Sequence, residues 1–276
     1  MSVPGDDDAD WARLGDVDIC FRLGGAGPPV LFVSGTGSDL RQRPGVFDGP
    51  LARHFSVLAY DHRGLGRSTS RDEPVTMADF ADDAALLLSH VGWHRCAVVG
   101  VSFGGMVAQE LALRHPDSVD RLVLCCTSPG GEGGASYPLH TLEGMEEEDR
   151  ARIVIGLSDD RHGPQWQAAN PERTATLVAA AAARAVGQDE PDRRTGARRQ
   201  LEARAGHDTW DRLEGLRQPT LVCAGRYDGI APLANSQALA QRIPEARLEV
   251  FEGGHLFLLQ DERAWPTIID FLGERA

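Results

Sequence analysis

The sequence predicts an α/β fold with a mostly parallel central sheet, flanked by helices and interrupted by one helical insertion. Short β-branched or apolar runs alternate with helical patterns along most of the chain, which is typical of strands joined by covering helices. Several runs are almost continuously apolar, as expected for strands buried on both faces of a sheet. Residues 130–216 break this alternation, because their patterns are helical only.

Seven runs are predicted to be strands because they are short, apolar and bounded by turn residues. In chain order they are Val17–Leu23, Pro29–Ser34, Ser56–Tyr60, Arg95–Val101, Val119–Cys126, Thr220–Ala224 and Arg247–Phe251. The helices predicted between and after them are Met77–His90, Gly104–Arg114, Leu233–Arg242 and Arg263–Gly273. Pro116, just past the second helix, fits a helix stop. We expect residues 1–10 to form a mobile tail.

The insertion begins at a glycine-rich loop and continues as three predicted helices, Gly144–Leu157, Pro171–Gly187 and Pro191–Ala205. Its alanine run at 179–183 has a high helix propensity. The chain is therefore predicted to fold as a core of residues 1–129 and 217–276, with residues 130–216 as a helical unit between two strands.

Composition excludes several classes of protein. A hydrophobic fraction of 42% in 276 residues is enough for a sizeable core. A formal net charge of −13 argues against a nucleic-acid partner, because phosphate binding needs a clustered basic surface. Five cysteines, each in or beside an apolar run, indicate buried free thiols, and their spacing suggests no metal site. Without a signal-peptide pattern or a long apolar run, we expect a cytoplasmic protein that does not enter a membrane.

The strongest local signal for chemistry is the segment Gly100-Val101-Ser102-Phe103-Gly104. It follows an apolar strand and precedes a helical pattern, the context that a G-x-S-x-G nucleophile elbow requires. The sharp turn exposes the hydroxyl of Ser102 at the carboxyl edge of the sheet, and the small glycines let strand and helix approach closely. The helix N-terminus behind Ser102 favours developing negative charge.

A serine is a weak nucleophile unless a neighbouring base takes its proton. His255 is the candidate base, because it follows two glycines directly after the last predicted strand. Asp228, which comes soon after the strand Thr220–Ala224, is the candidate for the acid that fixes the tautomer of the base. The order Ser–Asp–His, with each residue after the carboxyl end of a strand, predicts a catalytic triad.

Over residues 15 to 273, approximately, the chain resembles the α/β-hydrolase superfamily. Within this superfamily it is most similar to the branch of enol-lactonases, haloperoxidase-type esterases and carbon–carbon hydrolases. The resemblance rests on the elbow, on residues 34–38 and 61–68, and on the segments around Asp228 and His255. It implies an oxyanion hole formed by the backbone N–H groups of Thr36 and Phe103. The family commonly has His-Gly where this chain has Ser34-Gly35, which changes the support of that loop.

The resemblance also implies that the helical insertion is a cap over the active site. Side chains of the cap that could form a wall of the substrate pocket are Trp166, Tyr137, His140 and His162. In the block 61–68, Asp61 and the arginines are interpreted as residues that brace a loop.

The leading functional hypothesis is a serine hydrolase that cleaves an ester or lactone of a small to medium organic substrate through an acyl-enzyme on Ser102. The same triad would also serve a carbon–carbon bond hydrolase, an acyltransferase or a perhydrolase, and the fold could instead serve a non-hydrolytic ligand-binding protein or cyclase. No cofactor and no metal are expected. The expected partner is a small-molecule substrate, the composition is compatible with a bacterial enzyme, and a homo-oligomer is compatible with the sequence.

Overall fold

The computed structural model describes residues 9–71, 73–183, 187 and 190–274. It contains one eight-stranded sheet with the strand order β1-β2-β4-β3-β5-β6-β7-β8. The strands are β1 (Asp10–Leu14), β2 (Val17–Gly24), β3 (Pro29–Val33), β4 (Ser56–Tyr60), β5 (Cys96–Val101), β6 (Val119–Cys125), β7 (Thr220–Gly225) and β8 (Arg247–Phe251). Strands β1 and β2 pair antiparallel with each other and β2 with β4, whereas all later pairs are parallel.

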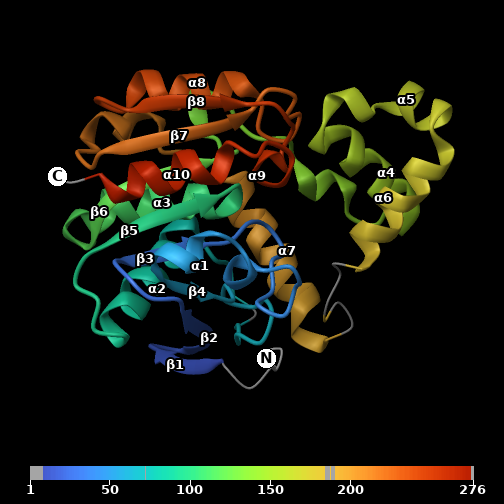
Figure 1. The fold of residues 1–276 in the computed structure, drawn as a ribbon. Coiled ribbons are helices and arrows are strands. Elements are labelled where there is room, and N and C mark those ends of the chain that lie inside the picture. The colour runs from blue at the N-terminus through green and yellow to red at the C-terminus, as the bar shows by residue number, and fades with distance from the viewer. Residues whose placement is uncertain (1–8, 72, 184–186, 188–189, 275–276) are drawn as a thin grey trace.

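Helices cover both faces of the sheet (Figure 1). Those of the core are α1 (Leu51–His54), α2 (Met77–His90), α3 (Phe103–Arg114), α8 (Leu233–Arg242), α9 (Phe257–Gln260) and α10 (Ala264–Gly273). Alternate residues of a strand pack into different layers: Val98 lies in the cluster that includes α2, α3 and α8, and Val99 in the cluster that includes α1, α9 and α10. This two-sided burial explains why the central strands are almost continuously apolar.

The predicted helix Met77–His90 has the same bounds in the structure, and its start has a clear local cause. Thr76 Oγ1 accepts a hydrogen bond from the backbone N–H of Asp79, and the Asp79 carboxylate accepts one from the backbone N–H of Thr76. This reciprocal capping box satisfies N–H groups that a helix start otherwise leaves unpaired.

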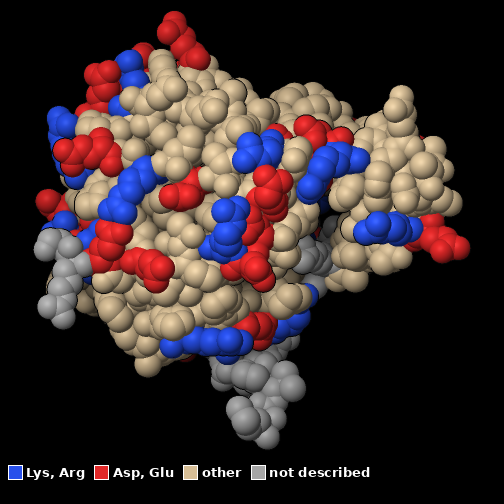
Figure 2. Space-filling model, turned by 45° about the horizontal axis from the view of Figure 1, so that its top comes forward, with Lys and Arg blue, Asp and Glu red and all other residues tan. Residues whose placement is uncertain are grey.

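Between β6 and β7 the chain forms the helices α4 (Glu147–Ser158), α5 (Pro164–Ala169), α6 (Pro171–Ala183) and α7 (Pro191–Ala205), with 3-10 turns between several of them. Helices α4, α5 and α6 stand together to one side of the sheet, whereas α7 lies against the core (Figure 1). Figure 2 shows the same division as a notch between the main body and a smaller lobe.

Several predicted boundaries are wrong. The expected tail of residues 1–10 ends earlier, because Asp10 begins β1 and pairs with Phe21 of β2, while residues 1–8 lie outside the described residues. The helix predicted to begin at Gly144 begins at Glu147, because Gly144 has a positive φ of 79°, which lies outside the right-handed helical region. The helix predicted to reach Gly187 is described as far as Ala183, and residues 184–186 lie outside the described residues.

All five cysteines are free and buried. Among the described residues, no helix is both long and apolar enough to span a membrane.

Candidate active site

Ser102 sits in a strained turn between β5 and α3. Its φ of 57° and ψ of −116° place a residue with a side chain in a region that favours glycine, at a cost of about 1–3 kcal/mol. Hydrogen bonds on both sides hold the turn: Ser102 N donates to Cys125 O at 2.8 Å, and Ser102 O accepts from Gly105 N at 2.9 Å. Thr127 Oγ1 donates to the same carbonyl at 2.8 Å. The surrounding structure therefore fixes the conformation that projects the hydroxyl from the sheet edge.

Two glycines, Gly100 and Gly104, allow strand β5 and helix α3 to pack closely at this turn. A Cβ atom on Gly100 would lie 2.4 Å from Gly104 O, and one on Gly104 would lie 2.0 Å from Val33 O. Both distances are far below van der Waals contact, so any side chain at these two positions would push α3 away from the strands.

His255 links the serine to a carboxylate. Its Nε2 lies 2.9 Å from Ser102 Oγ, and its Nδ1 lies 2.7 Å from Asp228 Oδ2. An ionised carboxylate can only accept, so Nδ1 carries the proton and Nε2 is free to accept from the serine hydroxyl. This is the tautomer that a general base needs.

Two further contacts fix the loop that carries His255. Its backbone N–H donates to Ser158 O at 2.6 Å, so the end of α4 is joined directly to this loop. A Cβ atom on Gly254 would lie 1.9 Å from the same carbonyl oxygen, which explains the glycine before the histidine.

The carboxylate of Asp228 is held in place by hydrogen bonds from the backbone. Its Oδ1 accepts from the backbone N–H groups of Ile230 at 2.8 Å and Ala231 at 2.9 Å, while Oδ2 faces His255. The side chain is 1% exposed, so each carboxylate oxygen has its partners inside the protein. These three acceptor contacts fix the rotation of the carboxylate group.

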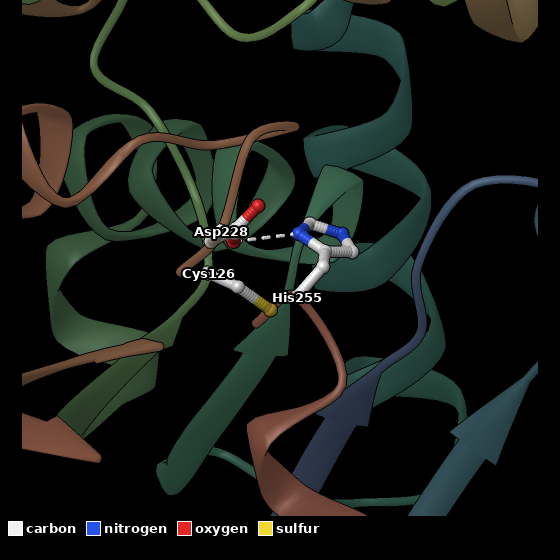
Figure 3. Close-up of side chains that lie close together, drawn as sticks. All are labelled: Cys126, Asp228 and His255. Atoms are coloured by element: carbon white, nitrogen blue, oxygen red, sulfur yellow. Dashed lines mark hydrogen bonds and ion pairs between the residues drawn. The ribbon is translucent and has the colours of Figure 1, made fainter. Parts of the chain in front are cut away.

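Cys126 lies beside the histidine and the aspartate, and Figure 3 shows the three side chains together. One potential ligand atom from each falls within 4.8 Å of the others, a spacing that a metal ion could bridge. However, Asp228 and His255 already use their facing atoms for each other, and burial raises the pKa of the Cys126 thiol well above its ordinary value. A neutral thiol is a poor metal ligand, so the cluster fits a serine–histidine–aspartate system better than a metal centre.

The loop predicted to form the oxyanion hole passes over Ser102. A Cβ atom on Gly35 would lie 3.5 Å from Ser102 Cβ, and Ser38 N donates to Gly35 O in a turn that includes Thr36. Phe103 is the first residue of α3, where backbone N–H groups have no partner within the helix. Phe103 and Gly35, which directly precedes Thr36, thus lie beside Ser102, and the role of Thr36 and Phe103 as oxyanion donors stays a prediction.

A histidine that the sequence analysis did not single out braces this loop. His62 Nε2 lies 3.0 Å from Ser34 O, and the ring packs edge-on against Phe80 and Phe103. Burial lowers the pKa of His62 to about 4, so the ring is neutral and donates this hydrogen bond through Nε2–H. The block 61–68 thus supports the loop at Ser34 through this hydrogen bond from a side chain to the backbone.

Asp61 and Arg63 of that block also act as braces. Asp61 Oδ1 accepts from Leu40 N at 2.7 Å and Oδ2 from Arg67 N at 3.0 Å, which joins two loops at the sheet edge. Arg63 forms a two-point ion pair with the buried Asp83 of α2.

Helix α7 contacts the other side of the oxyanion loop, which sequence reasoning missed. Gln200 Oε1 accepts from Gly37 N at 2.9 Å, and Arg193 Nη2 donates to Gly37 O at 2.9 Å. A Cβ atom on Gly196 would lie 1.8 Å from Gly64 O, so the helix backbone rests directly on the neighbouring loop. No local pattern could have revealed these contacts, since the partners lie more than a hundred residues apart in the chain.

The four cap residues predicted to line a pocket are not gathered in one place. His162 and Trp166 pack against each other with ring centroids 4.3 Å apart, and Arg173 lies over the Trp166 ring. Tyr137 contacts the core through its backbone, because its N–H donates to Ile230 O. His140 lines a small cavity beside α7. Their role in substrate binding stays a prediction.

Residues 28–262 match a family model described as the alpha/beta hydrolase fold. The chain is 31% identical to a poly(3-hydroxyalkanoate) depolymerase of Ectopseudomonas oleovorans over 88% of this chain and 84% of that one. It is also 31% identical to a putative carbamate hydrolase RutD of Caulobacter sp. strain K31, over 96% and 99% of the two chains. Among solved structures, a hydrolase from Pseudomonas aeruginosa PA01 matches with a TM-score of 0.79 and 26% identity, covering 98% of this chain and all of that one.

Proposed function

The chain belongs to the α/β-hydrolase fold family, and on that premise we propose that it is a serine hydrolase that cleaves an ester or a lactone through an acyl-enzyme on Ser102. The observation that carries this proposal is the continuous hydrogen-bonded chain from Ser102 Oγ through His255 to Asp228. Each member is held by further contacts, which support this arrangement.

In the proposed reaction, Ser102 Oγ attacks the substrate carbonyl while His255 Nε2 takes the hydroxyl proton. Asp228 holds the ring and stabilises the imidazolium that forms. The N–H groups of Phe103 and Thr36 receive the oxyanion, and losing one such donor typically costs about 3–4 kcal/mol of transition-state stabilisation. His255 then returns the proton to the leaving alcohol and activates the water that releases the acid.

The names of the relatives support a carbonyl-centred reaction. Poly(3-hydroxyalkanoates) and carbamates both contain a carbonyl bonded to an oxygen or nitrogen leaving group, which a serine triad can attack. The helical insertion contacts the His255 loop through α4 and the oxyanion loop through α7. We infer that it acts as a cap, which limits water access and selects the substrate.

The test compares the wild-type protein with Ser102→Ala. Both are incubated with a fluorophosphonate probe and weighed as intact proteins, and hydrolysis of short p-nitrophenyl esters is followed in parallel. We expect one adduct on the wild type, none on the variant, and loss of the ester turnover in the variant.

Other outcomes separate the alternatives. A wild type that is labelled but does not hydrolyse esters would favour acyl transfer, perhydrolysis or carbon–carbon cleavage by the same triad. A wild type that is not labelled would contradict the serine mechanism and favour a ligand-binding protein or cyclase.

A further inference from the structure

The end of α4 contacts both loops that carry the candidate base and its aspartate. Leu157 O accepts a hydrogen bond at 2.8 Å from the backbone N–H of Gly229, which directly follows Asp228. One residue further along α4, Ser158 O accepts from the backbone N–H of His255 at 2.6 Å. The chain leaves α4 at this point, so the residue that follows lies where the helical insertion meets the two loops.

That residue, Asp159, is a buried carboxylate that the proposed reaction does not use. Its side chain is 3% exposed, and Arg161 donates to both of its oxygens, from Nε to Oδ1 at 2.8 Å and from Nη2 to Oδ2 at 2.6 Å. Burial alone would raise the pKa of Asp159, but the hydrogen bonds from Arg161 hold it below its ordinary value. The carboxylate is therefore ionised at neutral pH and can only accept hydrogen bonds.

Gln260 of α9 connects this carboxylate to the loop of the histidine. Its Nε2 donates to Asp159 Oδ2 at 3.2 Å, and its Oε1 accepts from the backbone N–H of Gly254 at 2.8 Å. Because the carboxylate can only accept and the backbone N–H can only donate, the side-chain amide has one orientation that satisfies both. A Cβ atom on Gly253 would lie 2.6 Å from Gln260 Oε1, so the amide rests directly against the loop. Gly254 is the residue before His255.

We propose that Asp159 is a positioning residue: it orients the amide of Gln260, which holds the loop that carries His255. The helical insertion then acts on the rate of the chemical step and not only on substrate binding. The effect on rate rests on the proposed hydrolase function, whereas the hold on the loop can be measured without a substrate.

The test reverses the direction of one hydrogen bond. Asp159→Asn alone turns an NH₂ group toward the NH₂ group of Gln260, and Gln260→Glu alone sets two carboxylates against each other. The double variant Asp159→Asn/Gln260→Glu again has one donor and one acceptor, because the new amide donates to the new carboxylate, whose other oxygen still accepts from Gly254 N. Gln260 is exposed, so its substitution should leave the protein folded.

The kinetic readout is the hydrolysis of short p-nitrophenyl esters. A misplacement of about 1 Å can cost about 10²-fold in rate, and for the smaller displacement expected here each single substitution should lower kcat about tenfold. The double variant should recover most of this loss. His255 serves both formation and release of the acyl-enzyme, so KM should stay nearly unchanged. The rate of labelling by the fluorophosphonate probe should fall and recover together with kcat.

Asp149→Asn is the matched control, because Asp149 is an exposed carboxylate in the first turn of the same helix. It should keep the wild-type kcat, KM and labelling rate. Three results would overturn the proposal: wild-type kcat in both single variants, a rise in KM with kcat unchanged, or a loss in the double variant as large as the product of the two single losses.

Amide hydrogen exchange separates this proposal from the hydrolase function. We expect a peptide covering residues 252–260 to exchange faster in each single variant than in the wild type, and at the wild-type rate in the double variant. If esters are not hydrolysed but exchange follows this pattern, the hydrolase proposal fails and the hold of Asp159 on the loop stands. If esters are hydrolysed but both single variants exchange and turn over like the wild type, the positioning role fails and the hydrolase proposal stands.

Discussion

Asp228 uses its two carboxylate oxygens for different purposes, and this makes a sharp prediction for Asp228→Asn. Oδ1 is held by two backbone N–H donors, so the amide oxygen of asparagine would take that position. Its NH₂ group would then face His255 Nδ1, which would have to accept and not donate. The proton would move to Nε2, where the ring could no longer take the serine proton. We expect kcat for a good ester substrate to fall by about 10³–10⁴.

The variant should remain folded, because an amide replaces a carboxylate of the same shape. Circular dichroism and the thermal midpoint check this, and Asp160→Asn, at an exposed carboxylate of the insertion, is the control for general effects. Wild-type kcat in Asp228→Asn would show that Asp228 does not set the tautomer of His255.

At the scale of elements, the docking of α7 on the core depends on the absence of a side chain at Gly196. Alanine favours a helix over glycine by about 1 kcal/mol, so propensity alone predicts that Gly196→Ala is stabilising. The contact with Gly64 predicts the opposite, because the added methyl group would collide with a backbone carbonyl. We expect a loss of about 1–3 kcal/mol in the free energy of unfolding, measured with urea.

Activity should fall in the same variant, since α7 also holds Gly37 of the oxyanion loop through Gln200 and Arg193. Gly273→Ala is the matched control, because a Cβ atom there meets no atom within 4 Å. An unchanged or higher stability of Gly196→Ala would mean that α7 can move away from the core at no cost.

Most strands and helices of the core could be predicted from the sequence because each of them carries its own local signal. Helix α2 has a capping box and a regular apolar spacing, and β5 and β7 are continuous apolar runs. Strand β1 has no such signal: two of its five residues are buried, and its place in the sheet depends on pairing with β2. A strand that is stabilised mainly by pairing with a neighbouring strand cannot be predicted from its own residues alone.

The same distinction applies to the candidate site. Ser102, Asp228 and His255 could be brought together from the sequence because parallel strands place their carboxyl ends at one edge of a sheet. The hydrogen bond from His62 to Ser34 and those of Gln200 and Arg193 with Gly37 depend on how distant segments pack. The sequence predicts that helix α7 exists, but not which of its faces contacts the core.

At the scale of the whole molecule, two buried neutral histidines link stability to pH. Burial lowers the pKa values of His62 and His207 to about 4, below the value near 6.5 of an unfolded chain. The unfolded state therefore binds these protons first, and the stabilisation present above pH 6.5 is lost as pH falls toward 4. Each histidine should cost the folded state about 2 kcal/mol between pH 7 and pH 5.

This contribution can be isolated with His207→Gln, in which the side-chain amide can still donate to Ser128 O. The free energy of unfolding of the wild type and the variant is measured in urea at pH 7 and at pH 5. We expect the variant to lose about 2 kcal/mol less than the wild type over this interval. Asp61 works in the opposite direction, since burial raises its pKa to about 6, but it is present in both proteins and cancels in the difference. Equal losses in the two proteins would mean that His207 is protonated as readily in the folded state as in the unfolded one.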